Sequence, residues 1–120
     1  MSTNAYATLV NKTLTTDTPN VIDFNQMAEN ITFEIKPNGT VTAGAVTLQV
    51  SIDGTTWFSP PTAAFTNLSG ATLANPYVLV TGTNALFTLT NLAVRYAQVI
   101  VSTNVTGGAT VSAFVSASGA

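Results

Sequence analysis

Side chains with chemical reactivity are few and scattered in this sequence. Neither histidine nor cysteine occurs among its 120 residues, so a Ser-His-Asp or Cys-His nucleophile and a histidine-based metal site are excluded. The carboxylates are Asp17, Asp23, Glu29, Glu34 and Asp53. Only Asp23 and Glu29 flank one irregular connection, where two acids could form a glycosidase-type pair or share a calcium ion. Because two acids near a bend are more often simply solvated, we predict no catalytic residue, no metal and no cofactor, and therefore no enzyme.

The adjacent rings of Trp57 and Phe58 are the side chains most open to a binding role. In an all-β module an exposed aromatic row can stack on sugar rings, so carbohydrate binding is one interpretation. The simpler interpretation, which we favour, is that one ring enters the core and the other covers its rim. Arg95 lies in a stretch rich in valine, isoleucine and alanine, where it either pairs with a carboxylate or carbonyl group or faces a partner subunit.

The charge content of the chain excludes two classes of partner. Charged residues make up 7% of the sequence, against about 25% in an ordinary soluble domain. Three basic residues and a net charge of -2 provide no electrostatic footprint for phosphate backbones or anionic lipids. We therefore predict neither a nucleic-acid partner nor a membrane partner.

One stretch, residues 45–61 (AVTLQVSIDGTTWFSPP), combines a strand, a turn and the only tryptophan. Its first half alternates apolar and polar residues, which is typical of a strand with one buried face, and ITFEIK at 31–36 does the same. Asp53-Gly54 favours a two-residue turn that pairs residues 55–58 back onto the strand. The core predicted from this alternation is Ile31, Phe33, Ile35, Val46, Leu48, Val50 and Ile52.

The rest of the chain also predicts strands and turns. Further strands are expected at 6–16, 21–24, 77–81, 86–89, 94–102 and 109–118. Asn38-Gly39, Gly82–Asn84 and Gly107-Gly108 predict tight links that join neighbouring strands as hairpins. Residues 26–29 predict an irregular connection, and residues 61–76 a long covering loop with room for a short strand.

These expected strands determine the fold class. About eight short strands with turn signals between them, and no convincing helix, are typical of a sandwich or barrel. We predict an all-β fold in which residues 1–120 form a single antiparallel β-sandwich that is jelly-roll-like, with an immunoglobulin-like sandwich as the alternative.

Three segments resemble small β-sandwich virion proteins of phages, the capsid decoration or cement proteins and related head or tail accessory proteins. They are VTLQVSIDGTTW at 46–57, NLAVRYAQVIVS at 91–102, and the glycine-containing loop that leads into the last strand. Ser-x-Asp-Gly-x-x-Trp also occurs in discoidin-like and carbohydrate-binding sandwiches. The resemblance implies a structural virion protein without an active site, which binds the outer surface of a phage capsid and stabilises it.

This resemblance leads to expectations about location and partners. The protein is expected on the capsid exterior of a virion assembled in the host cytoplasm, bound to the phage's major capsid protein, and a homotrimer is one option for its oligomeric state. Two alternatives stay open: a carbohydrate-binding module of adhesin or lectin type, and a tail or fibre accessory domain. Residues 1–18 are expected to contact a partner, because apolar residues lie on both sides of this predicted strand. The predicted interface residues are Tyr6, Leu9, Val10, Leu14, Trp57, Phe58 and Arg95.

Overall fold

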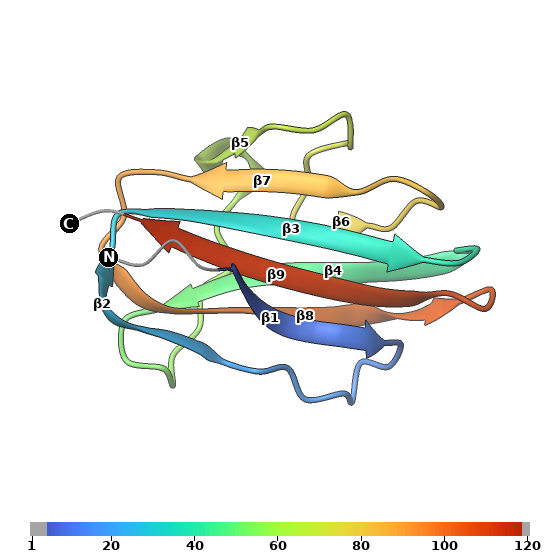
Figure 1. Cartoon of the computed structure of the whole chain (residues 1–120), viewed down its shortest axis with the longest axis horizontal. Helices are drawn as coiled ribbons and strands as arrows, with labels where there is room; N and C mark the ends of the chain where they lie inside the picture. Colours follow the sequence, from blue (N-terminus) through green and yellow to red (C-terminus); the bar gives the residue numbers. More distant parts are fainter. Residues whose placement is uncertain (1–4, 119–120) are drawn as a thin grey trace.

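Alternating apolar and polar residues favour strands, and strands account for almost all regular structure in the computed structural model, which describes residues 5–118 (Figure 1). The strands are β1 (Ala5–Lys12), β2 (Ile22–Ala28), β3 (Asn30–Asn38), β4 (Ala43–Ser51), β5 (Phe65–Asn67), β6 (Tyr77–Val78), β7 (Ala85–Leu89), β8 (Val94–Thr106) and β9 (Thr110–Ser118). A single 3-10 turn, η1 (Thr62–Ala64), precedes β5. Among the described residues, no helix is long and apolar enough to span a membrane.

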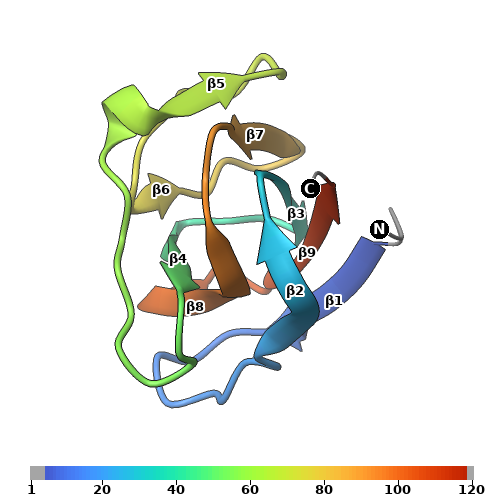
Figure 2. The ribbon, with the colours of Figure 1, turned by 90° about the vertical axis from the view of Figure 1, so that its left-hand side faces the viewer.

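The strands form two antiparallel sheets that pack face to face (Figures 1 and 2). The five-stranded sheet has the order β1-β9-β3-β7-β5, and the four-stranded sheet has the order β2-β8-β4-β6. Odd-numbered strands thus lie in one sheet and even-numbered strands in the other. Apart from the added edge strand β5, this is the strand order of a jelly roll, which confirms the predicted sandwich. The immunoglobulin-like alternative is wrong, because that fold pairs some consecutive strands within one sheet.

The hairpins predicted at the glycine-containing links 38–39, 82–84 and 107–108 are wrong, because the strands that each link joins lie in different sheets. Each glycine-containing link leads from one sheet to the other, so β3 and β4, β6 and β7, and β8 and β9 do not pair. The two strands joined by each link both have an apolar side. Placing them in opposite sheets buries these apolar sides against each other in the core. Gly107, with φ of 97°, brings two of these links together: a Cβ atom there would lie 2.7 Å from the carbonyl oxygen of Thr40.

The core lies between the sheets and is formed by alternate residues of the long strands. In β9 every second residue is buried, and in β3 the same holds from Ile31 to Ile35. An aromatic cluster fills one part of the core: the rings of Tyr77 and Phe87 lie 5.4 Å apart, and Phe65 contacts both Phe33 and Phe87 edge-on. Of the seven predicted core residues, six are buried: Ile31, Phe33, Ile35, Val46, Leu48 and Val50.

Ile52 is the exception, with 60% of its surface exposed. Strand β4 ends at Ser51, whose hydroxyl accepts a hydrogen bond from the backbone N–H of Gly54 at 2.9 Å. Asp53 Oδ1 then accepts hydrogen bonds from the N–H groups of Thr55 and Thr56, both at 2.9 Å. These side-chain contacts direct the chain away from the sheet before Ile52 can turn inward. The predicted two-residue hairpin is therefore a longer turn, and its return strand is one bridge between Val50 and Phe58.

Two other segments differ from, or refine, the prediction. Residues 26–29, expected to be irregular, belong largely to β2, which continues to Ala28 past Asn25 with its positive φ of 62°. The register shift between Asp23 and Ala28 marks a bulge, which hides the period of two in the sequence. In the predicted covering loop, the short strand is β5.

Alanine substitutions test the assigned inner face. Phe33→Ala should lower the free energy of unfolding by about 3–5 kcal/mol and Leu48→Ala by about 2–5 kcal/mol, because each empties a fully buried site. Ile52→Ala is the matched control and should change it by less than about 0.5 kcal/mol. Urea denaturation followed by circular dichroism measures all three. Equal losses for Ile52→Ala and Leu48→Ala would contradict the end of β4 at Ser51.

Acid should destabilise the fold through its turn aspartates. Backbone N–H groups of Leu14 and Thr13 lower the pKa of Asp17, and those of Thr56 and Thr55 lower the pKa of Asp53. Their stabilising contribution is full above the unfolded pKa of about 4 and is lost as the pH falls through the lower folded pKa. We expect the Tm to fall below about pH 4, and less steeply in the double variant Asp17→Asn, Asp53→Asn. Calorimetry measures the Tm against pH for both proteins. If the Tm of the double variant falls with pH as steeply as that of the wild type, other carboxylates cause the acid sensitivity.

Candidate functional site

Asp23 and Arg95 form an exposed ion pair that joins β2 to β8. Arg95 Nε donates to Asp23 Oδ1 at 2.8 Å, and Nη2 donates to Oδ2 at 3.0 Å. The guanidinium lowers the pKa of Asp23, with a further contribution from the N–H of Asn25, and Asp23 in turn raises the pKa of Arg95. The guanidinium also lies 5.4 Å from the centre of the Tyr96 ring. Asp23 is thus the carboxylate partner of Arg95. Because both carboxylate oxygens of Asp23 accept hydrogen bonds from Arg95, Asp23 is not free to act with Glu29 as a pair of catalytic acids. Within residues 5–118, no three side chains of metal-ligating type lie together.

The clearest candidate contact surface lies along the edge strands β1 and β2, at one side of the sandwich (Figure 2). Large apolar side chains on these strands and on the connection between them are exposed to solvent: Tyr6 (38%) and Val10 (51%) on β1, Leu14 (47%) and Val21 (47%) on the connection, and Met27 (44%) on β2. We call these five residues the apolar margin. Three of them, Tyr6, Val10 and Leu14, were predicted interface residues. Leu9 was also predicted there, but it is fully buried in the core and offers no surface to a partner.

Hydrogen bonds of Thr8 in β1 fix this strand to β8 and to the connection that leads into β2. The Thr8 hydroxyl donates to the carbonyl of Asn20 at 2.8 Å and accepts from the N–H of Val99 at 3.2 Å. The N–H of Asn20 donates back to the carbonyl of Thr8 at 2.9 Å. The rings of Tyr6 and Phe24 meet beside this contact, with their centres 6.4 Å apart. The Thr8 carbonyl at the free edge of β1 is therefore already occupied by Asn20. A partner would contact mainly the side chains of the apolar margin and not a free strand edge.

Trp57 and Phe58 lie away from the apolar margin. Phe58 pairs with Val50 of β4 through two backbone hydrogen bonds of 3.0 Å, and β4 is separated from β2 by β8. The Phe58 side chain is 61% exposed, Trp57 is half-buried, and neither ring belongs to the core. The interpretation that one ring enters the core is wrong, because the Asp53 turn keeps this segment outside the sheets. The seven predicted interface residues therefore do not form one surface.

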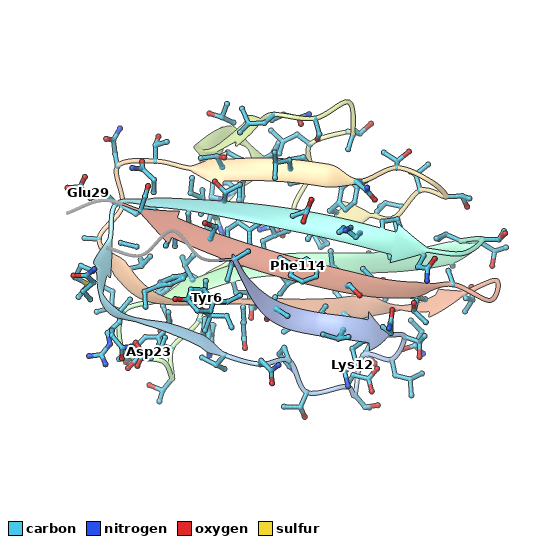
Figure 3. The ribbon with its side chains drawn as sticks, viewed as in Figure 1. Tyr6, Lys12, Asp23, Glu29 and Phe114 are labelled. Carbon is cyan, nitrogen blue, oxygen red and sulfur yellow. The ribbon has the colours of Figure 1, made fainter. Side chains whose placement is uncertain are left out.

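A further candidate site lies on the outer face of the five-stranded sheet, around Phe114 of β9 (Figure 3). A hollow of about 340 Å³ lies on one side of Phe114 and a second one of about 170 Å³ on the other, and Phe114 lines both. Sequence reasoning missed this residue. Its signal was present in ATVSAFVSAS, where the outward positions carry Thr110, Ser112 and Ser116 and one large aromatic residue among them.

Comparisons with known proteins indicate a fold but not a family. No protein-family model and no curated protein matches the chain. Among solved structures, the crystal structure of SPBc2 prophage-derived protein YomS is similar, with a TM-score of 0.59, 13% sequence identity, and coverage of 98% of this chain and 94% of that one. The chain therefore shares its β-sandwich fold, along nearly its whole length, with a prophage-derived protein.

Proposed function

We propose that the protein is a structural component of a phage particle, a decoration protein that binds the outer surface of the capsid after assembly in the host cytoplasm. The observation that carries this proposal is the apolar margin, a set of exposed large side chains on the edge strands β1 and β2 and on the connection between them. The fold shared with a prophage-derived protein supports the phage setting. No catalytic role is proposed, in keeping with the absence of histidine and cysteine.

Binding through Tyr6, Val10 and Leu14 removes apolar area from water, a contribution that salt does not screen. Lys12, Asp17 and the Asp23–Arg95 ion pair lie in or beside the same part of the chain, and their opposite signs cancel, so they give a charged partner no net attraction. The expected partner is the major capsid protein, which offers many identical sites in a shell, so an oligomer that binds several of them gains avidity even where one contact is weak. A homotrimer that presents three margins would increase that avidity further.

Point variants test this better than truncation of the N-terminal segment. Residues 1–4 lie outside the described residues, whereas residues 5–12 form β1, which pairs with β9 and places Leu9 in the core. Deleting this segment would therefore unfold the sandwich and remove any activity for a trivial reason. Serine substitutions of exposed margin residues leave the strand pairing intact.

The experiment mixes purified protein with phage particles that lack its gene product, followed by sedimentation and quantitative mass spectrometry. The wild-type protein should bind in many copies per particle. The variant Tyr6→Ser, Val10→Ser, Leu14→Ser should bind at least about tenfold more weakly, because burying one large apolar side chain contributes about 1.5–3 kcal/mol. The matched control is Leu68→Ser, Val78→Ser, Val80→Ser, which alters three equally exposed residues near β5 and β6 and should bind like wild type.

Two results would contradict the proposal. If the wild-type protein never sediments with particles, the virion role fails. If the margin variant binds as tightly as the control variant while both melt like wild type, the contact lies elsewhere on the molecule. Electron microscopy of gold-labelled protein separates a capsid position from the tail or fibre alternative, and light scattering in solution determines whether it is a trimer.

A further inference from the structure

The outer face of the five-stranded sheet has an ordered arrangement of side chains around one aromatic ring. Strand register places Phe114 of β9 opposite Glu34 of β3, which in turn faces Leu86 of β7. The next row toward one end of the sheet contains Ser112 and Lys36, and the next row toward the other end contains Ser116, Thr32 and Thr88. Small residues on either side of a central ring leave the two hollows that Phe114 lines.

Amide side chains surround the larger hollow. It is lined by Asn11, Lys36, Asn38, Asn84, Ser112 and Phe114, together with Pro37. Asn11 has a positive φ of 51° and is fixed by its Oδ1 atom, which accepts from the Thr110 hydroxyl at 3.2 Å, and by its N–H, which donates to the Ser112 hydroxyl at 3.0 Å. Within residues 5–118, the side-chain amides of Asn38 and Asn84 make no hydrogen bond, so each offers a donor and an acceptor to a ligand.

The lining restricts the kind of ligand that could bind. Lys36 lines the larger hollow and Glu34 the smaller one, so a ligand that spans both hollows meets one charge of each sign and gains nothing from a net charge of its own. A purely apolar ligand would desolvate the amides and the lysine without replacing their hydrogen bonds. A neutral ligand with hydroxyl groups along its rim and an apolar flat side satisfies both the amides and the ring.

We infer that the two hollows beside Phe114 together bind a neutral oligosaccharide. One sugar ring lies against Phe114, and its hydroxyl groups exchange hydrogen bonds with the amides of Asn38 and Asn84. Lys36, whose ammonium lies 5.8 Å from the centre of the Phe114 ring, is exposed and moves aside to donate to a hydroxyl group. The second hollow continues past Phe114 toward Ser116 and leaves room for a further sugar unit. This site differs from Trp57 and Phe58, and it does not depend on the proposed function, because it uses the sheet face and not the apolar margin.

The test is a titration of the full-length, isotope-labelled protein with soluble neutral oligosaccharides of glucose, galactose, mannose, N-acetylglucosamine or rhamnose, followed by amide chemical shifts in NMR. At least one sugar should shift the amides of residues 36–38, 84 and 112–116. Phe114→Ala should weaken that binding at least about tenfold, whereas Phe114→Tyr, which keeps the ring, should retain it. Trp57→Ala and Phe58→Ala serve as controls and should bind like wild type.

The outcomes are decisive in both directions. Absence of binding across the whole panel overturns the inference, and so do shifts centred on Trp57 and Phe58. Equal affinity of wild type and Phe114→Ala, with melting temperatures unchanged, also overturns it. Affinity should stay constant between about 0.05 M and about 0.5 M salt, since no ionic contact is involved. A steep loss with salt would instead indicate an anionic ligand and would contradict a neutral sugar.

Discussion

Mutual burial of the two inner sheet faces is the interaction on which the rest of the structure depends. The chain has no cysteine, and the ion pair between Asp23 and Arg95 is exposed, so neither cross-links nor buried charges add much to it. Apolar residues are therefore committed to the interior at every second position of β9 and of β3 from Ile31 to Ile35. This leaves the outer faces to threonine, serine and asparagine, and it makes the few large side chains that lie outside, such as Phe114 and Val10, candidates for contact with other molecules.

The sequence predicted the local structure better than the assembly of the strands. Alternation identified the inward residues of β3 and β4 because a period of two is a property of a single strand. Pairing is a property of two strands, and a glycine link such as Gly107-Gly108 reverses the chain without determining which layer it enters. The three hairpins predicted at glycine-containing links are wrong because each link leads into the other sheet. The prediction for Ile52 was wrong for a related reason: the Asp53 carboxylate accepts hydrogen bonds from the N–H groups of Thr55 and Thr56, and this turn ends the strand although the apolar alternation continues.

The candidate sites were predicted in part. The apolar residues on both sides of the N-terminal strand correctly suggested surplus apolar surface, and Tyr6 and Val10 are exposed. The bulge between Ala7 and Leu9 changes the register of this strand, and the position of Leu9 in the core could not be derived from alternation alone. Phe114 stands at an outward position among small residues, and its side follows from the burial of Val111, Ala113 and Val115 at the alternate positions of β9. That it lines two hollows depends on its neighbours Glu34 and Lys36 on β3, and pairing with β3 is a property that β9 alone does not reveal.

The position of the last two strands has a consequence for biosynthesis. Strand β8 lies between β2 and β4, and β9 lies between β1 and β3, so the strands that join β1 and β2 to their sheets are the last two of the nine described strands to be synthesised. Until then, β1 and β2 have no partner strand, and their apolar sides are exposed in the nascent polypeptide. Strands β1 and β2 can join their sheets only after β8 and β9 have been synthesised, and such contacts between distant parts of the chain form slowly. A message cut short before Thr110 would yield a chain that lacks the strand between β1 and β3, with unpaired edges that favour aggregation.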